Sequence, residues 1–254
     1  MPKPVLSVFP RDDSTTRVYA HIDRVGASTS PDFVLVHGIG MSHRYFRRLH
    51  ARLAAAGNVY SIDLPGYGGN RRPRASMSVR DGAVAIAATL DAMGLRSCVV
   101  VGHSMGAQFA ADLGILRPDL VSHLVLIAPV VDPRHPTALG HALPMMVNSL
   151  FEKPIINAIE FADYVRCGPR WYFSQLREMT THSIAGRLAL VTMPVLVLRG
   201  ARDALVTRQW STALAACVTG GRAESIRGGA HVIQYSQPKR VAAAIARFLA
   251  PTAV

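Results

Sequence analysis

The sequence predicts an α/β fold in which helices cover both faces of a mostly parallel, twisted sheet. Short runs rich in β-branched residues alternate along the 254 residues with segments whose apolar side chains recur at helical spacing. The short runs are apolar throughout, which is typical of strands covered on both faces. Half of the residues are hydrophobic, so the chain can bury a sizeable core, and a disordered chain is excluded.

Seven strands and five helices are predicted from this alternation. The strands lie at residues 18–23, 33–36, 59–63, 98–101, 124–127 and 195–198, and a short C-terminal strand is flanked by the glycine pairs 220–221 and 228–229. The helices lie at residues 43–56, 79–93, 106–116, 208–216 and 238–249. Because strands and helices alternate, neighbouring strands are expected to run parallel.

The last of these helices has the clearest terminal signals. Ser236 is predicted to cap its N-terminus, and Pro238 suits its first turn. Val241, Ile245, Phe248 and Leu249 then form an apolar stripe. This helix is predicted to have a structural role.

The segment between the strands at 124–127 and 195–198 breaks the alternation. It has more than sixty residues, and prolines such as Pro144, Pro154 and Pro169 interrupt helical pieces at 150–164 and 171–179. Loops in compact domains usually have about 4 to 6 residues, so this segment is predicted to form a structure of its own. We expect a helical cap at 132–190, inserted into a core domain formed by residues 1–131 and 191–254.

The charge balance is strongly basic, with 28 Lys and Arg residues against 16 Asp and Glu residues, a net charge of +12. Such a balance suggests an anionic partner. However, the chain has no recognisable nucleic-acid-reading module, so we expect no nucleic-acid partner and interpret the charge as a surface property. Arg71, Arg72 and Arg74 form the densest basic run, which is either a solvated loop or a rim that favours anionic substrates.

The cysteines and the apolar runs indicate the compartment. Cys98, Cys167 and Cys217 are three in number and widely spaced, which indicates neither a disulfide framework nor a zinc site. The first fourteen residues lack the apolar run of a secretory signal, and no apolar run approaches the roughly 20 residues of a membrane span. We therefore expect a cytoplasmic protein without a membrane span, and the sequence leaves its oligomeric state open.

The strongest local signal is the sequence Gly-His-Ser-Met-Gly at residues 102–106, directly after the strand at 98–101. A serine on a tight turn from strand to helix projects its hydroxyl above the sheet, and small residues are needed two positions away because backbone segments meet there. Gly102 and Gly106 meet that need. The helix that follows also directs its N-terminal amides toward an oxyanion formed at Ser104.

This motif in its strand and helix context resembles the nucleophile elbow of the α/β-hydrolase family, in its serine-hydrolase and esterase-like branch with a small helical cap. Further landmarks follow in the family's order over most of the chain. They are the sequence at 37–40 after an early strand, the sequence at 63–68 after the next strand, and then the elbow, the cap insertion, Asp203 and His231. The resemblance implies the α/β-hydrolase fold.

The resemblance also implies a catalytic triad. A serine hydroxyl is a poor nucleophile at neutral pH, so Ser104 needs a histidine base, and that histidine needs a carboxylate to orient it. His231 and Asp203 stand where the family carries these two residues. Asp132 is the alternative acid, because some members take the carboxylate from the preceding strand end. The oxyanion hole is expected at the backbone amides of Ile39 and Met105.

Three further residues are candidates for substrate binding. Trp171 and Met145 belong to the predicted cap and either line a pocket or form its ordinary core. His37 lies beside the site and is either a substrate contact or a residue that shapes a loop.

The expected function is a cofactor-independent serine hydrolase that cleaves a carboxylic ester, lactone or thioester of a small, partly apolar molecule. No metal or nucleotide motif competes with this interpretation. The serine argues against the epoxide hydrolase and haloalkane dehalogenase branches, which use an aspartate at its position. A carbon–carbon bond hydrolase and a ligand sensor of the same fold are the alternatives, because fold alone does not decide between them.

Overall fold

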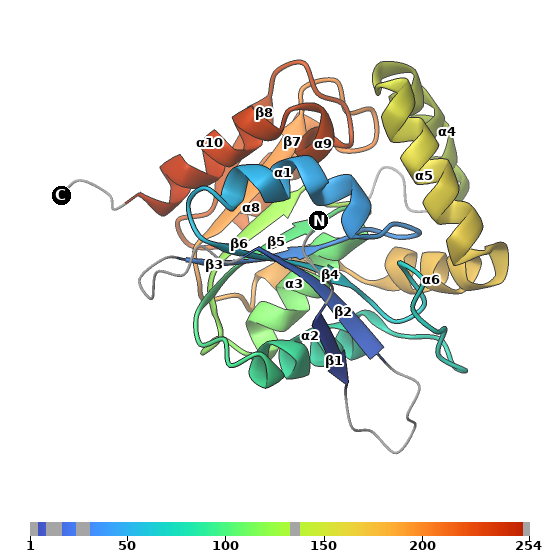
Figure 1. Ribbon diagram of the computed structural model, residues 1–254. Helices are drawn as coiled ribbons and strands as arrows, with labels where there is room; N and C mark the ends of the chain where they lie inside the picture. The colour runs from blue at the N-terminus through green and yellow to red at the C-terminus, as the bar shows by residue number, and fades with distance from the viewer. Residues whose placement is uncertain (1–4, 9–16, 24–30, 133–137, 251–254) are drawn as a thin grey trace.

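The computed structural model describes residues 5–8, 17–23, 31–132 and 138–250, which form a layered α/β structure (Figure 1). Within these residues a single sheet has eight strands in the order β1-β2-β4-β3-β5-β6-β7-β8. Their bounds are Val5–Val8 (β1), Arg17–Asp23 (β2), Asp32–Val36 (β3), Asn58–Asp63 (β4), Cys98–His103 (β5), Val121–Ile127 (β6), Val195–Gly200 (β7) and Arg222–Ile226 (β8).

The sheet is mostly parallel, as the sequence predicts. β1, β2 and β4 pair in antiparallel fashion, and every pairing from β4 through β3, β5, β6 and β7 to β8 is parallel. The central strands β5 and β7 are buried along their whole length, in agreement with their continuous apolar runs. β1 was not among the predicted strands, because its four residues are too few to establish a periodicity.

Helices cover the two faces of the sheet (Figure 1). On one face α2 (Val79–Ala92) packs against α3 (Met105–Leu116), which contacts β3, β5 and β6. On the other face α1 (Arg47–Leu53) contacts β4 and α10 (Pro238–Leu249), and the short helix η1 (His43–Phe46) precedes α1. α8 (Arg208–Ala216) packs against β7 and β8.

The start of α10 differs from its prediction. Ser236 is the last residue of the short helix α9 (Ile233–Ser236), and its hydroxyl donates to the Val232 carbonyl. Gln237 takes the capping position of α10 instead, without a side-chain hydrogen bond, and Pro238 occupies the first turn as expected. The predicted apolar stripe is buried at Val241, Ile245 and Phe248, and Leu249 is half-buried.

In the described residues between β6 and β7 there are four helices, and we refer to them as the inserted helices. They are α4 (Ala138–Phe151), α5 (Pro154–Cys167), α6 (Pro169–Thr181) and α7 (Ile184–Leu188). Pro154 and Pro169 begin α5 and α6, because the backbone before a proline disfavours helix and Lys153 is extended there. The predicted helix at 150–164 is therefore wrong in its first turn, and Pro144 lies inside α4 rather than ending it. The division of the chain at 132 and 190 stays a prediction.

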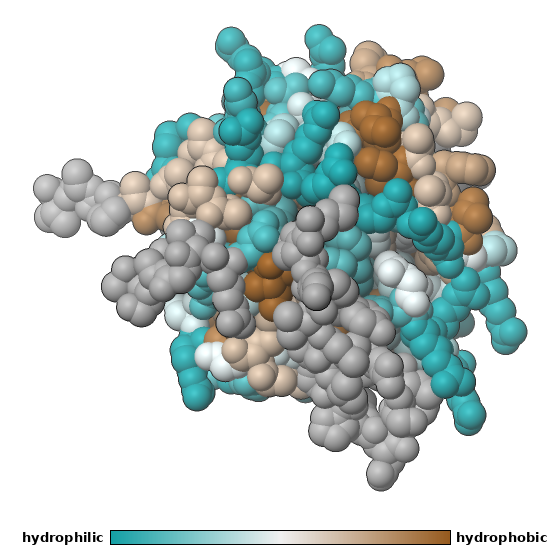
Figure 2. Space-filling model, in the orientation of Figure 1, coloured by the Kyte–Doolittle hydropathy of each residue, from teal (hydrophilic) through white to brown (hydrophobic). Residues whose placement is uncertain are grey.

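The surface of the inserted helices is unusually apolar. Of the nine large hydrophobic side chains that are exposed in the described part of the chain, all but Leu190 belong to α4, α5 or α6. Hydrophobic side chains reach the surface at the upper right of Figure 2, where Figure 1 places α4 and α5. Across the described ranges, no helix combines the length and apolarity required to pass through a lipid bilayer.

Candidate active site

Ser104 occupies a strained turn between β5 and α3. Its φ of 57° lies in the left-handed region, where a residue with a Cβ is uncommon. The turn is tight enough that a Cβ added to Gly102 would lie 2.3 Å from the Gly106 carbonyl oxygen, and one added to Gly106 would lie 2.2 Å from the Val36 oxygen. The two glycines therefore allow the backbone to present the Ser104 side chain at the carboxyl edge of the sheet.

Two backbone N–H groups beside Ser104 have no acceptor among the residues that the structure describes. They belong to Met105, the first residue of α3, and to Ile39, which follows β3 and lines the same cavity as Ser104. The first N–H groups of a helix lack intrahelical partners and carry partial positive charge. These two donors are therefore available to an oxygen atom that develops negative charge near Ser104.

His231 and Asp203 form a buried hydrogen-bonded pair. The His231 Nδ1 atom lies 2.9 Å from the Asp203 Oδ2 atom, and the two side chains are 3% and 0% exposed. The other carboxylate oxygen, Oδ1, accepts from the Leu205 and Val206 amides at 2.9 and 3.1 Å. It also accepts from Asn148 Nδ2 at 3.0 Å. With Nδ1 engaged, His231 has Nε2 left for proton transfer.

The pKa values of the pair move in opposite directions. Burial alone would lower the pKa of His231, but the charge and hydrogen bond of Asp203, with the charges of Glu160 and Glu152, raise it above its ordinary value of 6.5. Burial alone would raise the pKa of Asp203, but His231 and the Val206 and Leu205 amides lower it. The carboxylate is thus ionised, and His231 titrates above its ordinary range.

Asp132, the alternative acid, has a different partner. Its Oδ2 atom accepts from Thr207 Oγ1 at 3.2 Å, and it is buried near the end of the described segment 31–132. The imidazole of His231 is bonded to Asp203 instead. The geometry therefore favours Asp203 over Asp132 as the residue that orients His231.

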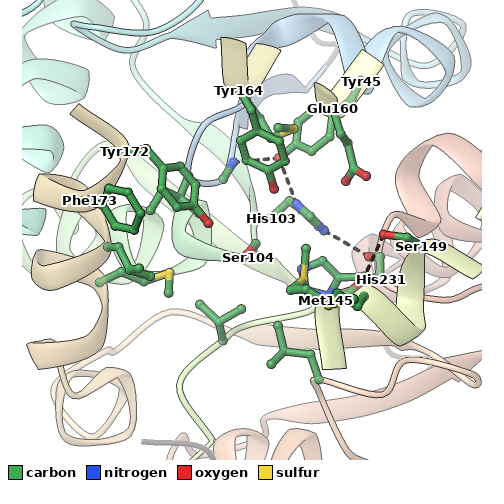
Figure 3. A pocket seen from close by; sticks show the side chains of 18 of the residues that line it. Tyr45, His103, Ser104, Met145, Ser149, Glu160, Tyr164, Tyr172, Phe173 and His231 are labelled. Atoms are coloured by element: carbon green, nitrogen blue, oxygen red, sulfur yellow. Dashed lines mark hydrogen bonds between the residues drawn. The ribbon is translucent and has the colours of Figure 1, made fainter. Parts of the chain in front are cut away.

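A hydrogen-bonded chain joins the three loops of the site (Figure 3). The Gly38 amide donates to the Tyr45 hydroxyl at 2.6 Å, Tyr45 Oη lies 2.9 Å from His103 Nδ1, and His103 Nε2 lies 3.0 Å from the His231 carbonyl oxygen. Since a carbonyl only accepts, His103 Nε2 carries the proton and Nδ1 accepts from Tyr45. Burial and the charge of His231 hold the pKa of His103 well below its ordinary value, so the ring is neutral.

Tyr45 is a residue of the site that could not be identified from the sequence. Tyr45 lies in η1, 58 residues before His103, and no local pattern joins the two. Its fully buried hydroxyl bridges the loop at Gly38 to the residue before Ser104. It therefore fixes the loop that carries Ile39.

A cavity of about 790 Å³ lies between the inserted helices and the carboxyl edge of the sheet. Ser104, His231 and Ile39 line it from the core, and Met145 lines it from α4, as predicted for a pocket residue. Aromatic and aliphatic side chains of α5 and α6 supply most of the rest, among them Tyr164, Val165, Tyr172, Phe173, Leu176 and Met179. The exposed side chains of Met146, Val165 and Phe173 also belong to its lining, so they mark its mouth.

Two of the predicted binding residues are not in the cavity lining. His37 is fully buried, its Nδ1 donating to the Gly38 carbonyl at 2.8 Å and its Nε2 accepting from the Leu64 amide at 3.1 Å. Trp171 packs so closely on Gly66 that an added Cβ there would lie 2.5 Å from its Nε1 atom. The arrangement favours the alternative interpretation of each residue, with His37 shaping a loop and Trp171 belonging to the core, and substrate contact by either side chain stays a prediction.

The basic run also lies outside the cavity lining. Arg71, Arg72 and Arg74 are exposed, and Arg72 donates to the carbonyl of Arg166 at the end of α5, at 2.9 Å. This contact ties the loop after β4 to the inserted helices. It does not direct positive charge into the cavity.

One cluster in the described part of the chain has side chains of the kind that bind metal ions. The donor atoms of His21, His43 and Asp63 lie within 4.8 Å of one another, outside the cavity lining. Asp63 Oδ2 lies 2.7 Å from His43 Nδ1 and 3.2 Å from His21 Nε2, and Asp63 Oδ1 accepts from the His43 amide at 2.6 Å. These hydrogen bonds account for the arrangement, and they place Asp63 as the residue that joins β4 to η1.

Comparison with known proteins agrees with this architecture. A sequence model of the alpha/beta hydrolase family matches residues 33–244. An uncharacterized protein of Mycobacterium tuberculosis is 25% identical over 269 aligned positions, which cover 89% of this chain and 77% of the relative.

Solved structures resemble the whole chain. Est816, described as an N-acyl homoserine lactone degrading enzyme, is similar with a TM-score of 0.79 at 20% identity, covering 95% of this chain and 99% of its own. An enol-lactonase of Burkholderia xenovorans LB400 has a TM-score of 0.79 at 18% identity and covers 92% of this chain and 96% of its own. At these identities the likeness concerns the fold.

Proposed function

Because this chain belongs to the alpha/beta hydrolase family, we propose that it is a serine hydrolase that cleaves a carboxylic ester, lactone or thioester of a small, partly apolar molecule. One observation carries the proposal. His231, which is hydrogen-bonded to buried Asp203, lines the same cavity as Ser104, and Ser104 stands on a strained turn at the start of a helix. This is the arrangement that activates a serine hydroxyl as a nucleophile.

The proposed reaction proceeds in two halves. Ser104 Oγ attacks the substrate carbonyl carbon while His231 Nε2 takes the hydroxyl proton, and the resulting oxyanion accepts hydrogen bonds from the Ile39 and Met105 amides. His231 then gives its proton to the leaving oxygen or sulfur, and the bond to the carbonyl carbon breaks, which leaves an acyl-enzyme. A water molecule, deprotonated by His231, hydrolyses the acyl-enzyme and restores the serine.

Asp203 acts by holding His231. Its hydrogen bond fixes the tautomer in which Nδ1 carries a proton and Nε2 is free to accept one, and its charge stabilises the imidazolium that forms. The raised pKa of His231 reflects the same stabilisation. No step of this scheme requires a cofactor.

The cavity supports a substrate that is apolar over most of its surface. Its walls are aromatic and aliphatic side chains, and its volume of about 790 Å³ is in the range of small-molecule sites. Burial of an apolar group contributes roughly 25 cal/mol per Å² toward binding, so such walls favour an acyl or aryl group over a fully polar one.

The test uses a panel of p-nitrophenyl esters, lactones and thioesters, with Ser104→Ala as the blank. We expect the parent to turn over at least one of these classes and a fluorophosphonate to label it at one site, while Ser104→Ala does neither. Full activity in Ser104→Ala would overturn the mechanism. Stoichiometric labelling without turnover of any acyl substrate would indicate a ligand sensor, and turnover of vinylogous 1,5-diketones alone would indicate a carbon–carbon bond hydrolase.

A further inference from the structure

Glu160 is the one carboxyl group among the described residues that line the cavity. It projects from α5 toward the space beside His231 (Figure 3). No described residue forms a hydrogen bond or an ion pair with it, although the other acidic side chains around the site, Asp203, Glu152 and Asp163, all have partners. Glu160 is half-buried at the cavity wall, so its carboxyl group, without a partner in the described protein, is open to a ligand that enters the cavity and displaces water from it.

The position of Glu160 is fixed by its helix. Three residues further along α5, buried Asp163 accepts from Ser42 Oγ at 2.6 Å and from Arg44 Nη1 at 2.8 Å, which anchors the helix to η1 and to its capping residue. One turn after Glu160, Tyr164 packs on Gly40, where an added Cβ would lie 2.4 Å from its ring. These contacts hold α5 against the core, so Glu160 stays at the wall of the cavity.

The two sides of Ser104 differ in chemistry (Figure 3). On one side lie Tyr172 and Phe173 of α6, whose rings are 5.7 Å apart, and on the other lie His231 and Glu160. The nearness of Glu160 to His231 also shows in the pKa of each, because the charge of either group acts on the other. In the proposed reaction His231 delivers a proton to the leaving group, so the leaving group occupies the side of the cavity that Glu160 faces.

We propose that Glu160 is a specificity-determining residue that accepts a hydrogen bond from a hydroxyl or amide N–H group on the leaving-alcohol part of the substrate. The proposal rests on the proposed function, since it assigns the two sides of the cavity by the role of His231. The apolar acyl part of the substrate lies against α6. The substrate class is thus an ester with an apolar acyl group and an alcohol that carries a second polar hydrogen.

The electrostatics of Glu160 agree with this role. Burial raises its pKa to about 7, so the group is not a permanent anion at neutral pH and suits a neutral donor better than an ammonium group. A donor on the substrate gives this carboxyl the partner that the protein does not supply. An analogue without the donor leaves the carboxyl desolvated and unpaired, which is the situation in which enzymes reject a near-isosteric substrate strongly.

The experiment compares two esters of the same acid and nearly the same shape, 3-(hydroxymethyl)phenyl butanoate and 3-ethylphenyl butanoate. For the parent we expect kcat/KM to be at least about tenfold higher for the hydroxymethyl ester, the effect of one hydrogen bond to a carboxylate. In Glu160→Leu this ratio should fall to about one, and Glu160→Gln, which keeps an acceptor oxygen, should retain part of it. Glu178→Leu on α6, outside the cavity lining, is the matched control and should keep the parental ratio.

A third ester separates the two sides of the cavity. Phenyl 4-(hydroxymethyl)benzoate carries its hydroxyl on the acyl part, and its kcat/KM relative to phenyl 4-ethylbenzoate should not respond to Glu160→Leu. The fluorophosphonate labelling rate of Ser104 reports on the proposed function without using Glu160. If the parent and both Glu160 variants label equally and share the same hydroxymethyl-to-ethyl ratio, the inference about Glu160 is overturned while the proposed function stands. If the parent neither labels nor hydrolyses these esters, the proposed function itself fails.

Discussion

Replacing Asp203 by Asn tests the acid of the proposed triad with the smallest change in shape. The structure determines how the new amide would sit. The Oδ1 position receives three donors, from Asn148 Nδ2 and from the Leu205 and Val206 amides, so it must hold the amide oxygen. The amide NH₂ group then faces His231 Nδ1, where Oδ2 accepts a hydrogen bond from the Nδ1–H group in the parent.

That orientation puts two donors against each other unless His231 changes tautomer. With Nδ1 as an acceptor, Nε2 carries the proton and can no longer take one from Ser104. Loss of the correct tautomer in a serine triad lowers kcat by about 10⁴, which corresponds to roughly 5.5 kcal/mol of transition-state stabilisation. We therefore expect Asp203→Asn to lose about four orders of magnitude in kcat/KM at pH 8, with a fold that is otherwise preserved.

The assay is hydrolysis of p-nitrophenyl butanoate, with thermal unfolding to verify the fold. Asp132→Asn is the control, because Asp132 Oδ2 accepts from Thr207 rather than contacting His231, and we expect a loss of less than about tenfold. Retention of a tenth or more of the activity in Asp203→Asn would refute the reasoning. A loss in Asp132→Asn equal to that expected for Asp203→Asn would transfer the role to Asp132.

Three further predictions follow from the same geometry. In Asn148→Ala the Ala204 amide loses a hydrogen bond of 2.9 Å and Asp203 Oδ1 loses one of 3.0 Å, so the free energy of unfolding should fall by roughly 2–4 kcal/mol and Tm by roughly 5–10 °C. The control Ser149→Ala should change Tm little. An unchanged Tm in Asn148→Ala would contradict this prediction. Gly102→Ala places a Cβ 2.3 Å from a backbone oxygen and should abolish soluble folded protein. The control Gly186→Ala, whose Cβ meets nothing closer than 3.4 Å, should express normally. Equal expression of the two variants would contradict this prediction. On the acidic side of the pH profile, kcat/KM should rise with pH as His231 loses its proton. The midpoint should lie above 6.5, because Asp203, Glu160 and Glu152 raise the pKa of His231 despite its burial. A midpoint below 6.5 would show that burial dominates.

The parts of the site that follow local rules could be predicted from the sequence. The turn at residues 102–106 needs small residues because of close backbone contacts, which Gly102 makes within the turn and Gly106 makes with the end of β3, and both are of the kind expected there. The central strands were predicted because continuous apolar runs have few alternatives in a sheet covered on both faces. His231 and Asp203 are predicted as base and acid from the resemblance to the α/β-hydrolase family, and the His231 Nδ1 atom lies 2.9 Å from Asp203 Oδ2.

The parts that depend on distant pairings could not be predicted. Tyr45, His103 and the His231 carbonyl form one chain only after three loops have met at the sheet edge. Pro144 was interpreted as an interruption, because a proline inside a helix removes a hydrogen bond, yet α4 continues through it. For this reason α4, the helix that carries Asn148, is not predicted from the sequence.

The position of Asn148 also changes how the inserted helices relate to the chemistry. From α4, Asn148 donates to Asp203 Oδ1 and accepts from the Ala204 amide. Glu152, the residue directly after α4, accepts from the amide of Val232, which follows His231, at 2.8 Å. α4 and the residue after it thus hold both loops that carry the candidate acid and base. The apolar residues of α6 contact the cavity from the far side of Ser104 and are docked instead through Gln108 of α3, whose amide donates to the Met179 carbonyl. Sequence change in α6 can therefore alter the shape of the substrate pocket alone, whereas change in α4 alters the orientation of the His231–Asp203 pair as well.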